Sequence, residues 1–208
     1  MNISSSTLAA LRATFPRDWP EIQFTSGAFG GVGVLAIGLE TTFSRGTLTI
    51  NSSSIYTHPI INPNWLSSPH DIELMVAGFK IAREILAAPA LASVNHGELA
   101  PGPAVQTDEE IAAYIHRVAQ DYGHFSCTCK MGKVDDPLAV VDSKARVFGV
   151  EGLRVVDASA FPFLTPGQPQ ATVYMLAEKI AAEILQEVSE EVKMEVVGCE
   201  TETIEVML

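Results

Sequence analysis

The residues best suited to chemistry lie together in the stretch DYGHFSCTCKMG, Asp121 to Gly132, which holds one histidine and two cysteines within six positions. Such a set could form a metal site, a redox pair or the surroundings of a catalytic base. A structural zinc site normally needs a second, similarly spaced pair of Cys or His ligands. Cys127 and Cys129 have no such second pair, and Cys199 stands alone. We therefore expect no metal site and interpret these cysteines as small packing residues.

His124 is the candidate catalytic residue of this stretch. Imidazole changes its protonation near neutral pH, which suits it to abstract and return protons. A lone histidine is more often structural, but His124 lies in a segment rich in Gly, Ser, Thr and Cys, whose small side chains leave room for a ligand beside the ring. A second polar cluster, Gln168 and Gln170, lies in the proline-rich stretch PFLTPGQPQ. These carboxamides could bind a ligand oxygen or cap the following helix, and spacing alone favours neither role.

The bulk composition excludes several classes of partner. The chain has 208 residues, 47% of them hydrophobic, which is enough for one domain with a substantial core. Its net charge of -12 argues against nucleic acids and anionic membranes, because both are polyanions. No apolar run is long enough to span a bilayer, and the N-terminus lacks the basic segment of a signal peptide. Three cysteines cannot all pair within one chain, so we expect reduced thiols in a cytoplasmic protein.

Strands are predicted in the first third of the chain, at 21–25, 32–39 and 44–50. The glycine-rich GAFGGVG connects the first two. A dinucleotide-binding loop leads from a strand into a helix, and here a second strand-like run follows, so we interpret GAFGGVG as a strand connection. The stretch GLRVVDAS predicts another short buried strand near the motif.

Helices are predicted where capping residues precede an apolar periodicity. Ser68 caps a helix that Pro89 ends, and Thr107 with Glu110 forms a capping box that opens a helix to about Gln120. A short helix opens the chain, and a last helix runs from about Gln170 to Glu187.

The composition changes near the end of the chain, so we assign 1–187 to one domain and 188–208 to an acidic tail. Eight glutamates and one lysine occupy positions 183–208. Apolar and polar residues alternate over 192–196 and again over 204–208, a pattern that predicts two short strands. A solvated tail fits the same charge run equally well.

The run from His124 to Ala181, HFSCTCKMG through PQATVYMLAEKIA, closely resembles the C-terminal region of the glucose–methanol–choline (GMC) oxidoreductases. SRGTLTINSSS, INPNWL and the helix after them resemble the same family, so that the resemblance extends from about Trp19 to Leu185. It is closest to the fungal aryl-alcohol-oxidase-like and natural-product branches. The resemblance implies an α+β fold in which helices pack on one face of an antiparallel sheet.

The resemblance also implies site residues. A full-length member oxidises an alcohol with FAD, and its active-site histidine, which takes the hydroxyl proton, matches His124. The second active-site position, His or Asn in the family, matches Gln168. Asp157 and Gln170 match positions that lie against the flavin. A carboxamide can hydrogen-bond but cannot act as a base near neutral pH, so Gln168 departs from the usual histidine.

The family's N-terminal flavin-binding fold has no counterpart in this sequence, so we expect no cofactor for the isolated chain. One hypothesis is a flavin-independent enzyme that cyclises, isomerises or dehydrates a small molecule, with His124 as acid/base and Gln168 as an orienting donor. Lyases and a polyketide cyclase in the family are similarly non-redox. The others are a fragment or split half of an FAD-dependent alcohol oxidoreductase and a non-catalytic small-molecule-binding module. A homodimer would cover apolar surface that a missing flavin domain exposes.

Overall fold

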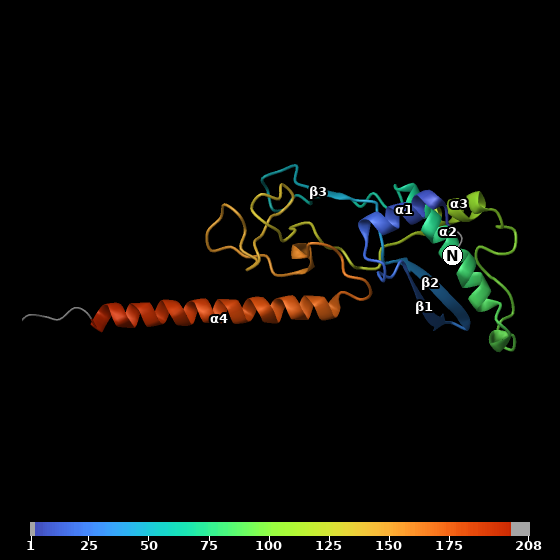
Figure 1. The fold of residues 1–208 in the computed structure, drawn as a ribbon. Coiled ribbons are helices and arrows are strands. Elements are labelled where there is room, and N and C mark those ends of the chain that lie inside the picture. Colours follow the sequence, from blue (N-terminus) through green and yellow to red (C-terminus); the bar gives the residue numbers. More distant parts are fainter. Residues whose placement is uncertain (1–2, 201–208) are drawn as a thin grey trace, which may run out of the picture. The chain divides into compact units, whose positions relative to one another are not determined.

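The computed structural model describes the backbone of residues 3–200 and the side chains of residues 3–190. The chain forms two compact units, of which the first ends at Gly123 and the second begins at His124 (Figure 1). The units divide just before the motif histidine. The single domain over 1–187 and the separate tail stay predictions.

The first unit is built on a β-hairpin and two helices. Strands β1 (Ile22–Phe29) and β2 (Val32–Leu39) pair antiparallel, from Ile22 opposite Leu39 to Phe29 opposite Val32. Gly30 and Gly31 form the turn with φ of 57° and 83°, a left-handed conformation that glycine adopts without steric cost. The glycine-rich stretch is therefore a strand connection, as predicted, although β1 continues four residues past the expected end and includes the first three residues of that stretch.

Helix α2 (Pro69–Leu86) covers one face of this hairpin. Ser68 caps it by accepting a hydrogen bond from the His70 backbone N–H, as predicted. Gly78 lets the helix approach the sheet, because a Cβ there would lie 2.9 Å from Ile22 Cδ1 and 3.1 Å from Ile37 Cγ2. Val76 faces α3 (Asp108–Val118), whose capping box of Thr107 and Glu110 is confirmed. This arrangement bears out the α+β fold class.

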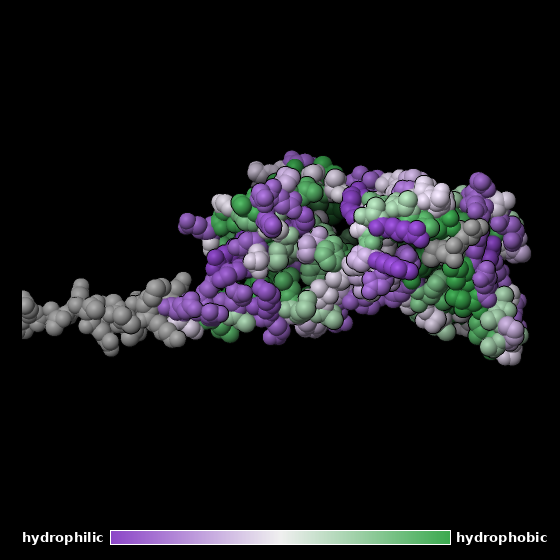
Figure 2. All heavy atoms as spheres, in the orientation of Figure 1, coloured by the Kyte–Doolittle hydropathy of each residue, from purple (hydrophilic) through white to green (hydrophobic). Residues whose placement is uncertain are grey.

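The remaining elements of this unit are short. They are α1 (Ser5–Thr14), the two-stranded antiparallel sheet of β3 (Thr47–Thr49) and β4 (Ile60–Asn62), and the 3-10 helix η1 (Pro89–Leu91). β3 is the centre of the predicted strand 44–50, and β4 is a strand beyond the three that the sequence predicted in this part of the chain. Figure 2 shows hydrophobic side chains on the surface over the β1–β2 hairpin, where Phe29 is 74% exposed.

Asp71 is the buried charge of the first unit. It is 1% exposed, and its two carboxylate oxygens accept the backbone N–H groups of Phe43 and Ser44, each at 2.8 Å. It also lies in the first turn of α2, where a negative charge is favoured by the helix dipole. One side chain therefore joins the start of α2 to the segment that leads into β3.

The second unit has little regular structure apart from its last helix. In its described part, the regular structure before that helix consists of isolated bridges and the 3-10 helix η2 (Ala158–Ala160). The bridges join Met131 with Val141, Val141 with Val147, and Arg146 with Arg154. The strand predicted over GLRVVDAS is wrong, because only Arg154 makes a bridge there and Asp157 already caps η2. Gly149 and Gly152, with φ of 74° and 71°, turn the backbone before a longer ladder can form.

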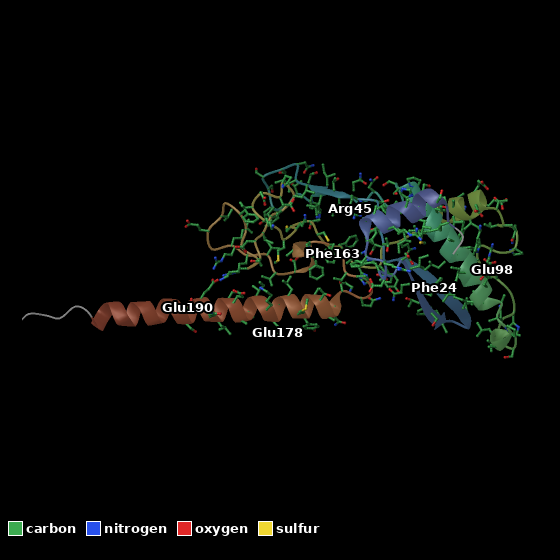
Figure 3. All side chains as sticks on the ribbon, viewed as in Figure 1. Phe24, Arg45, Glu98, Phe163, Glu178 and Glu190 are labelled. Atoms are coloured by element: carbon green, nitrogen blue, oxygen red, sulfur yellow. The ribbon has the colours of Figure 1, made fainter. Side chains whose placement is uncertain are left out.

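Helix α4 (Gln170–Glu200) closes the second unit and corrects the prediction for the tail. The strand expected over 192–196 is helical, and the one expected over 204–208 lies outside the described residues. Extending an existing helix adds a backbone hydrogen bond for each residue, whereas a strand needs a partner. Side-chain pairs four residues apart, Lys179 with Glu183 at 3.3 Å and Gln186 with Glu190 at 3.0 Å, support the helix. Glu178 and Glu190 project from it in Figure 3.

Glu187 fixes α4 to the loop before η2. Its carboxylate binds Arg146, Arg154 at 2.5 Å and Lys144 at 3.3 Å. Burial acts to raise the pKa of Glu187, but the hydrogen bond from Lys144 and the charges of the two arginines outweigh it and hold that pKa below the ordinary 4.5. The acidic run of 183–208 therefore contains a structural residue. Among the described residues, no helix has both the length and the apolar character needed to cross a bilayer.

Replacing Asp71 with Ala should destabilise the first unit by about 3 kcal/mol, because two buried backbone N–H groups lose their acceptor. Urea unfolding followed by circular dichroism measures the change. Asp108→Asn is the matched control, since Asp108 is exposed and pairs only with Lys80 at the surface, a contact worth about 1 kcal/mol or less. Equal losses for the two variants would contradict the role given to Asp71.

Replacing Glu187 with Gln should lower the thermal stability at pH 7, and the difference from the wild type should shrink as the pH falls below about 4.5. A carboxylate whose pKa is depressed by folding stabilises the fold above its unfolded-state pKa, and this contribution is lost as the pH falls through the folded-state value. Melting curves from pH 7 to pH 3 test this. Glu190→Gln is the control, because Glu190 accepts only from Gln186. A difference that persists unchanged at pH 3 would exclude the charge cluster as its cause.

Candidate active site

The motif segment is held in place by its backbone. The N–H groups of Cys127, Cys129 and Met131 donate to the carbonyl oxygens of Ala158 at 3.1 Å, Ser159 at 2.8 Å and Ala160 at 2.9 Å. Alternate residues of the segment are thereby hydrogen-bonded to η2. Ala160 of η2 is buried. Two stretches that are distant in sequence become neighbours, and His124 lies at the start of the first one.

His124 and Gln168, the two catalytic candidates, are in direct contact. His124 Nε2 lies 2.8 Å from Gln168 Oε1. Because a carboxamide oxygen only accepts, Nε2 carries the proton in this contact, and the neutral ring then has its lone pair on Nδ1. The expected orienting donor therefore acts as an acceptor toward His124. The amide nitrogen of Gln168 has no protein partner among the described contacts and can donate to a ligand.

The turn before α4 presents Gln168. Pro166 and Pro169 flank it, and Gly167 between them has a φ of 80°, which suits glycine. The Val173 backbone N–H donates to Pro169 O at 2.9 Å and joins the turn to the helix. Gln168 itself is exposed and His124 half-buried, so the pair is open to a ligand.

Asp157 and Gln170 occupy different positions from this pair. The Asp157 carboxylate accepts the Ser159 backbone N–H at 2.7 Å and caps η2, and Gln170 is the exposed first residue of α4. Their flavin-facing roles stay predictions. A dinucleotide site is normally built on a parallel sheet with a helix after its glycine-rich turn, and both described sheets are antiparallel pairs. The described residues therefore do not form a flavin site by themselves.

Cys127 has a conformation that no sequence pattern predicts. Its φ is 68°, in the left-handed region that is unusual for a residue with a side chain and that often marks functional sites. Its thiol lies 3.3 Å from Ser126 Oγ, and both Cys127 and Cys129 are free thiols that are partly exposed. Within the part of the chain that the structure describes, no three His, Cys, Asp or Glu residues are grouped to hold a metal ion.

The second unit has two surface depressions, of about 530 and 500 Å³. The first is lined by 130–133, 135–137 and Pro162, and the second by Asp142, 146–154 and Glu187. Neither is lined by His124 or Gln168. His124 can exchange a proton with a ligand, and Gln168 can hydrogen-bond it. Neither of the two depressions would enclose a ligand at this pair.

The sequence matches the family model described as GMC oxidoreductase over residues 42–177. Versicolorin B synthase of Aspergillus parasiticus is 49% identical over 192 residues, which cover 88% of this chain and 30% of that protein. Patulin synthase of Penicillium expansum is 48% identical, over 83% of this chain and 30% of its own length. The chain thus spans about a third or less of the curated relatives that it matches.

Solved structures show the same relationship. A fungal aryl-alcohol oxidase is 33% identical with a TM-score of 0.68, over 82% of this chain and 28% of that one. Pyridoxine 4-oxidase from Mesorbium loti is 31% identical with a TM-score of 0.71, over 79% and 34%. Both the matched motifs and the matched fold place the chain in the GMC oxidoreductase family, as a counterpart of its C-terminal region.

Proposed function

We propose that this chain is an acid–base enzyme that acts on a small oxygen-bearing natural product without a flavin. The single observation that carries the proposal is the 2.8 Å contact between His124 Nε2 and Gln168 Oε1. It pairs an imidazole, a side chain that can take up and return a proton, with a partner that orients the ring.

The chemistry follows from this contact. The His124 imidazole takes a proton from a substrate hydroxyl, or from a carbon next to a carbonyl group. Gln168 Oε1 accepts from Nε2–H and stabilises the cationic ring that results. The Gln168 amide donates to the substrate oxygen that gains negative charge. The ring then returns its proton, so cyclisation, isomerisation or dehydration balances without an electron acceptor.

The relatives support the chemical setting of this proposal. Two of these relatives are enzymes by name, a versicolorin B synthase and a patulin synthase. A small-molecule substrate from natural-product biosynthesis is therefore the class that we propose. A cytoplasmic location belongs to the same proposal, because the free thiols of Cys127 and Cys129 fit a reducing compartment.

A second candidate is an FAD-dependent alcohol oxidoreductase whose flavin site includes parts of the family fold that this chain does not span. The observation that favours it is the exposure of large apolar side chains in the second unit. Phe125 is 63% exposed, Phe163 55%, Tyr174 63% and Leu185 68%. Apolar surface of this kind normally packs against a partner. In this candidate Asp157 and Gln170 face the flavin, whereas in a flavin-independent enzyme a second copy of the chain covers the same surface.

Replacing His124 with Ala should lower turnover about 100-fold or more, because proton transfer loses its acceptor. Gln168→Leu should lower it by about 10-fold, since the ring remains but loses its orienting partner. The measurement is mass-spectrometric conversion of a panel of small hydroxy-carbonyl compounds without added flavin. His116→Ala, which changes an exposed histidine of α3, is the control. Unchanged turnover in His124→Ala would disprove the assigned role.

The absorption spectrum of the purified chain separates the two candidates. The acid–base enzyme should be colourless, and added FAD should not change its turnover. A yellow protein whose turnover depends on FAD would overturn the first candidate and support the second. Asp157→Asn sharpens the comparison, because an amide oxygen still caps η2 while the carboxylate charge is lost. The substitution should weaken FAD binding only if Asp157 faces the flavin.

A further inference from the structure

The sheet of β3 and β4 is an exposed part of the first unit, called here the β3–β4 arm (residues 46–65). Every residue of the arm is exposed. Each strand has three residues, and no third strand joins the pair among the described elements. A lone two-stranded sheet is marginally stable at best in water, so the arm gains stability when a further strand covers it.

The base of the arm is fixed even though its strands are uncovered. Asp71 holds the segment that leads into β3. Asn64 Nδ2 donates a hydrogen bond to Arg45 O at 3.1 Å and joins the two ends of the arm. A Cβ at Gly46 would lie 2.5 Å from Asn62 O, so glycine is what lets the strands approach there. The arm is therefore presented in a defined position on the first unit.

The two outer edges of the arm differ. Pro59 precedes β4 and Pro63 follows it, and proline has no backbone N–H that could pair with a further strand. β3 and the residues after it, up to Thr57, include neither a proline nor a charged residue, the devices that commonly protect an edge strand. Alternate residues of a strand direct their N–H and C=O groups to opposite sides, so the outer edge of β3 can accept another strand.

The arm is uncharged in an acidic protein. Between Arg45 and Asp71 the sequence contains no Asp, Glu, Lys or Arg, although the chain has 25 acidic and 13 basic residues. Large apolar side chains are exposed instead, with Ile50 at 81%, Ile55 at 92% and Tyr56 at 93%. The core of a protein interface is poor in charged residues and rich in aromatic ones. The arm therefore has the composition of a contact surface.

The charge and the symmetry of the arm favour a second copy of this chain as its partner. Two copies that each carry a net charge of -12 repel one another least where their surfaces are uncharged. Antiparallel pairing of one β3 with another is compatible with a two-fold axis, so the same edge serves both copies. The loop after each β3 then runs beside the start of the other copy's β3 and brings its apolar side chains into the contact.

The exposed apolar area of the arm is also sufficient. A stable dimer buries about 800 Å² on each partner, and an aromatic side chain alone can bury about 150–250 Å². The large apolar side chains that the arm exposes are Leu48, Ile50, Ile55, Tyr56, Ile60, Ile61 and Trp65. Two of these are aromatic, so the set supplies an area of the order that a dimer needs.

We infer that β3 is a self-association edge, at which two copies of this chain pair antiparallel and form a four-stranded sheet in the order β4–β3–β3–β4. The inference is independent of the proposed function, because His124 and Gln168 lie outside the arm. It assigns a contact between copies to the first unit.

Sedimentation equilibrium of the full chain over a wide range of concentration tests the inference. The wild type should approach twice the chain mass of 22.3 kDa as the concentration rises. Thr49→Lys should raise the dissociation constant of the dimer by about 10-fold or more, because two like charges then meet across the two-fold axis. Amide exchange of 47–50 should slow with rising concentration in the wild type and not in this variant.

Thr14→Lys is the control, because it makes the same change at the exposed end of α1 and should leave the dissociation constant unchanged. Thr47→Lys replaces Thr49→Lys if the latter does not fold. A dissociation constant that Thr49→Lys leaves unchanged would place the contact elsewhere and overturn the inference. A wild type that is monomeric at every concentration would also overturn it, and would leave the arm to a polypeptide that supplies other parts of the family fold.

Discussion

The site depends on the backbone pairing between residues 127–131 and η2. Its three hydrogen bonds come from alternate residues of the motif segment and end on three consecutive carbonyl groups, which a 3-10 turn brings within reach. Because the bonds are made by backbone, they do not depend on the identity of the side chains between them. They set the direction in which the chain arrives at His124, and Asp157 stabilises their acceptors by capping η2. The position of His124 in the second unit therefore depends on this pairing.

Helix α4 supplies the other half of the site. The turn before it brings Gln168 to His124, and its middle is fixed by Glu187, which binds cations from three positions of the preceding loop. The turn at the start of α4 and the ion pairs at its middle therefore fix the position of this helix in the second unit. One of the glutamates in the acidic run, Glu187, therefore has a structural role, because it joins α4 to the preceding loop.

Local signals predicted much of the fold. Ser68 and the Thr107–Glu110 capping box determine their helices through contacts within a few residues, and Gly30 with Gly31 determines a hairpin in the same way. The extent of α4 and the absence of a strand over GLRVVDAS were not predicted, because apolar alternation fits a strand but does not reveal whether a partner is present. The contact of His124 with Gln168 spans 44 positions, and the family resemblance, not spacing, identified both residues. The left-handed backbone of Cys127 had no signal in the sequence.

The central claim is that this chain by itself brings His124 and Gln168 together. Nuclear magnetic resonance of the isolated chain tests it through amide hydrogen exchange and the proximity of the two side chains. We predict slowed exchange at Cys127, Cys129 and Met131, together with a nuclear Overhauser effect between the His124 ring and the Gln168 side chain. Fast exchange at all three amides with no such effect would contradict the account.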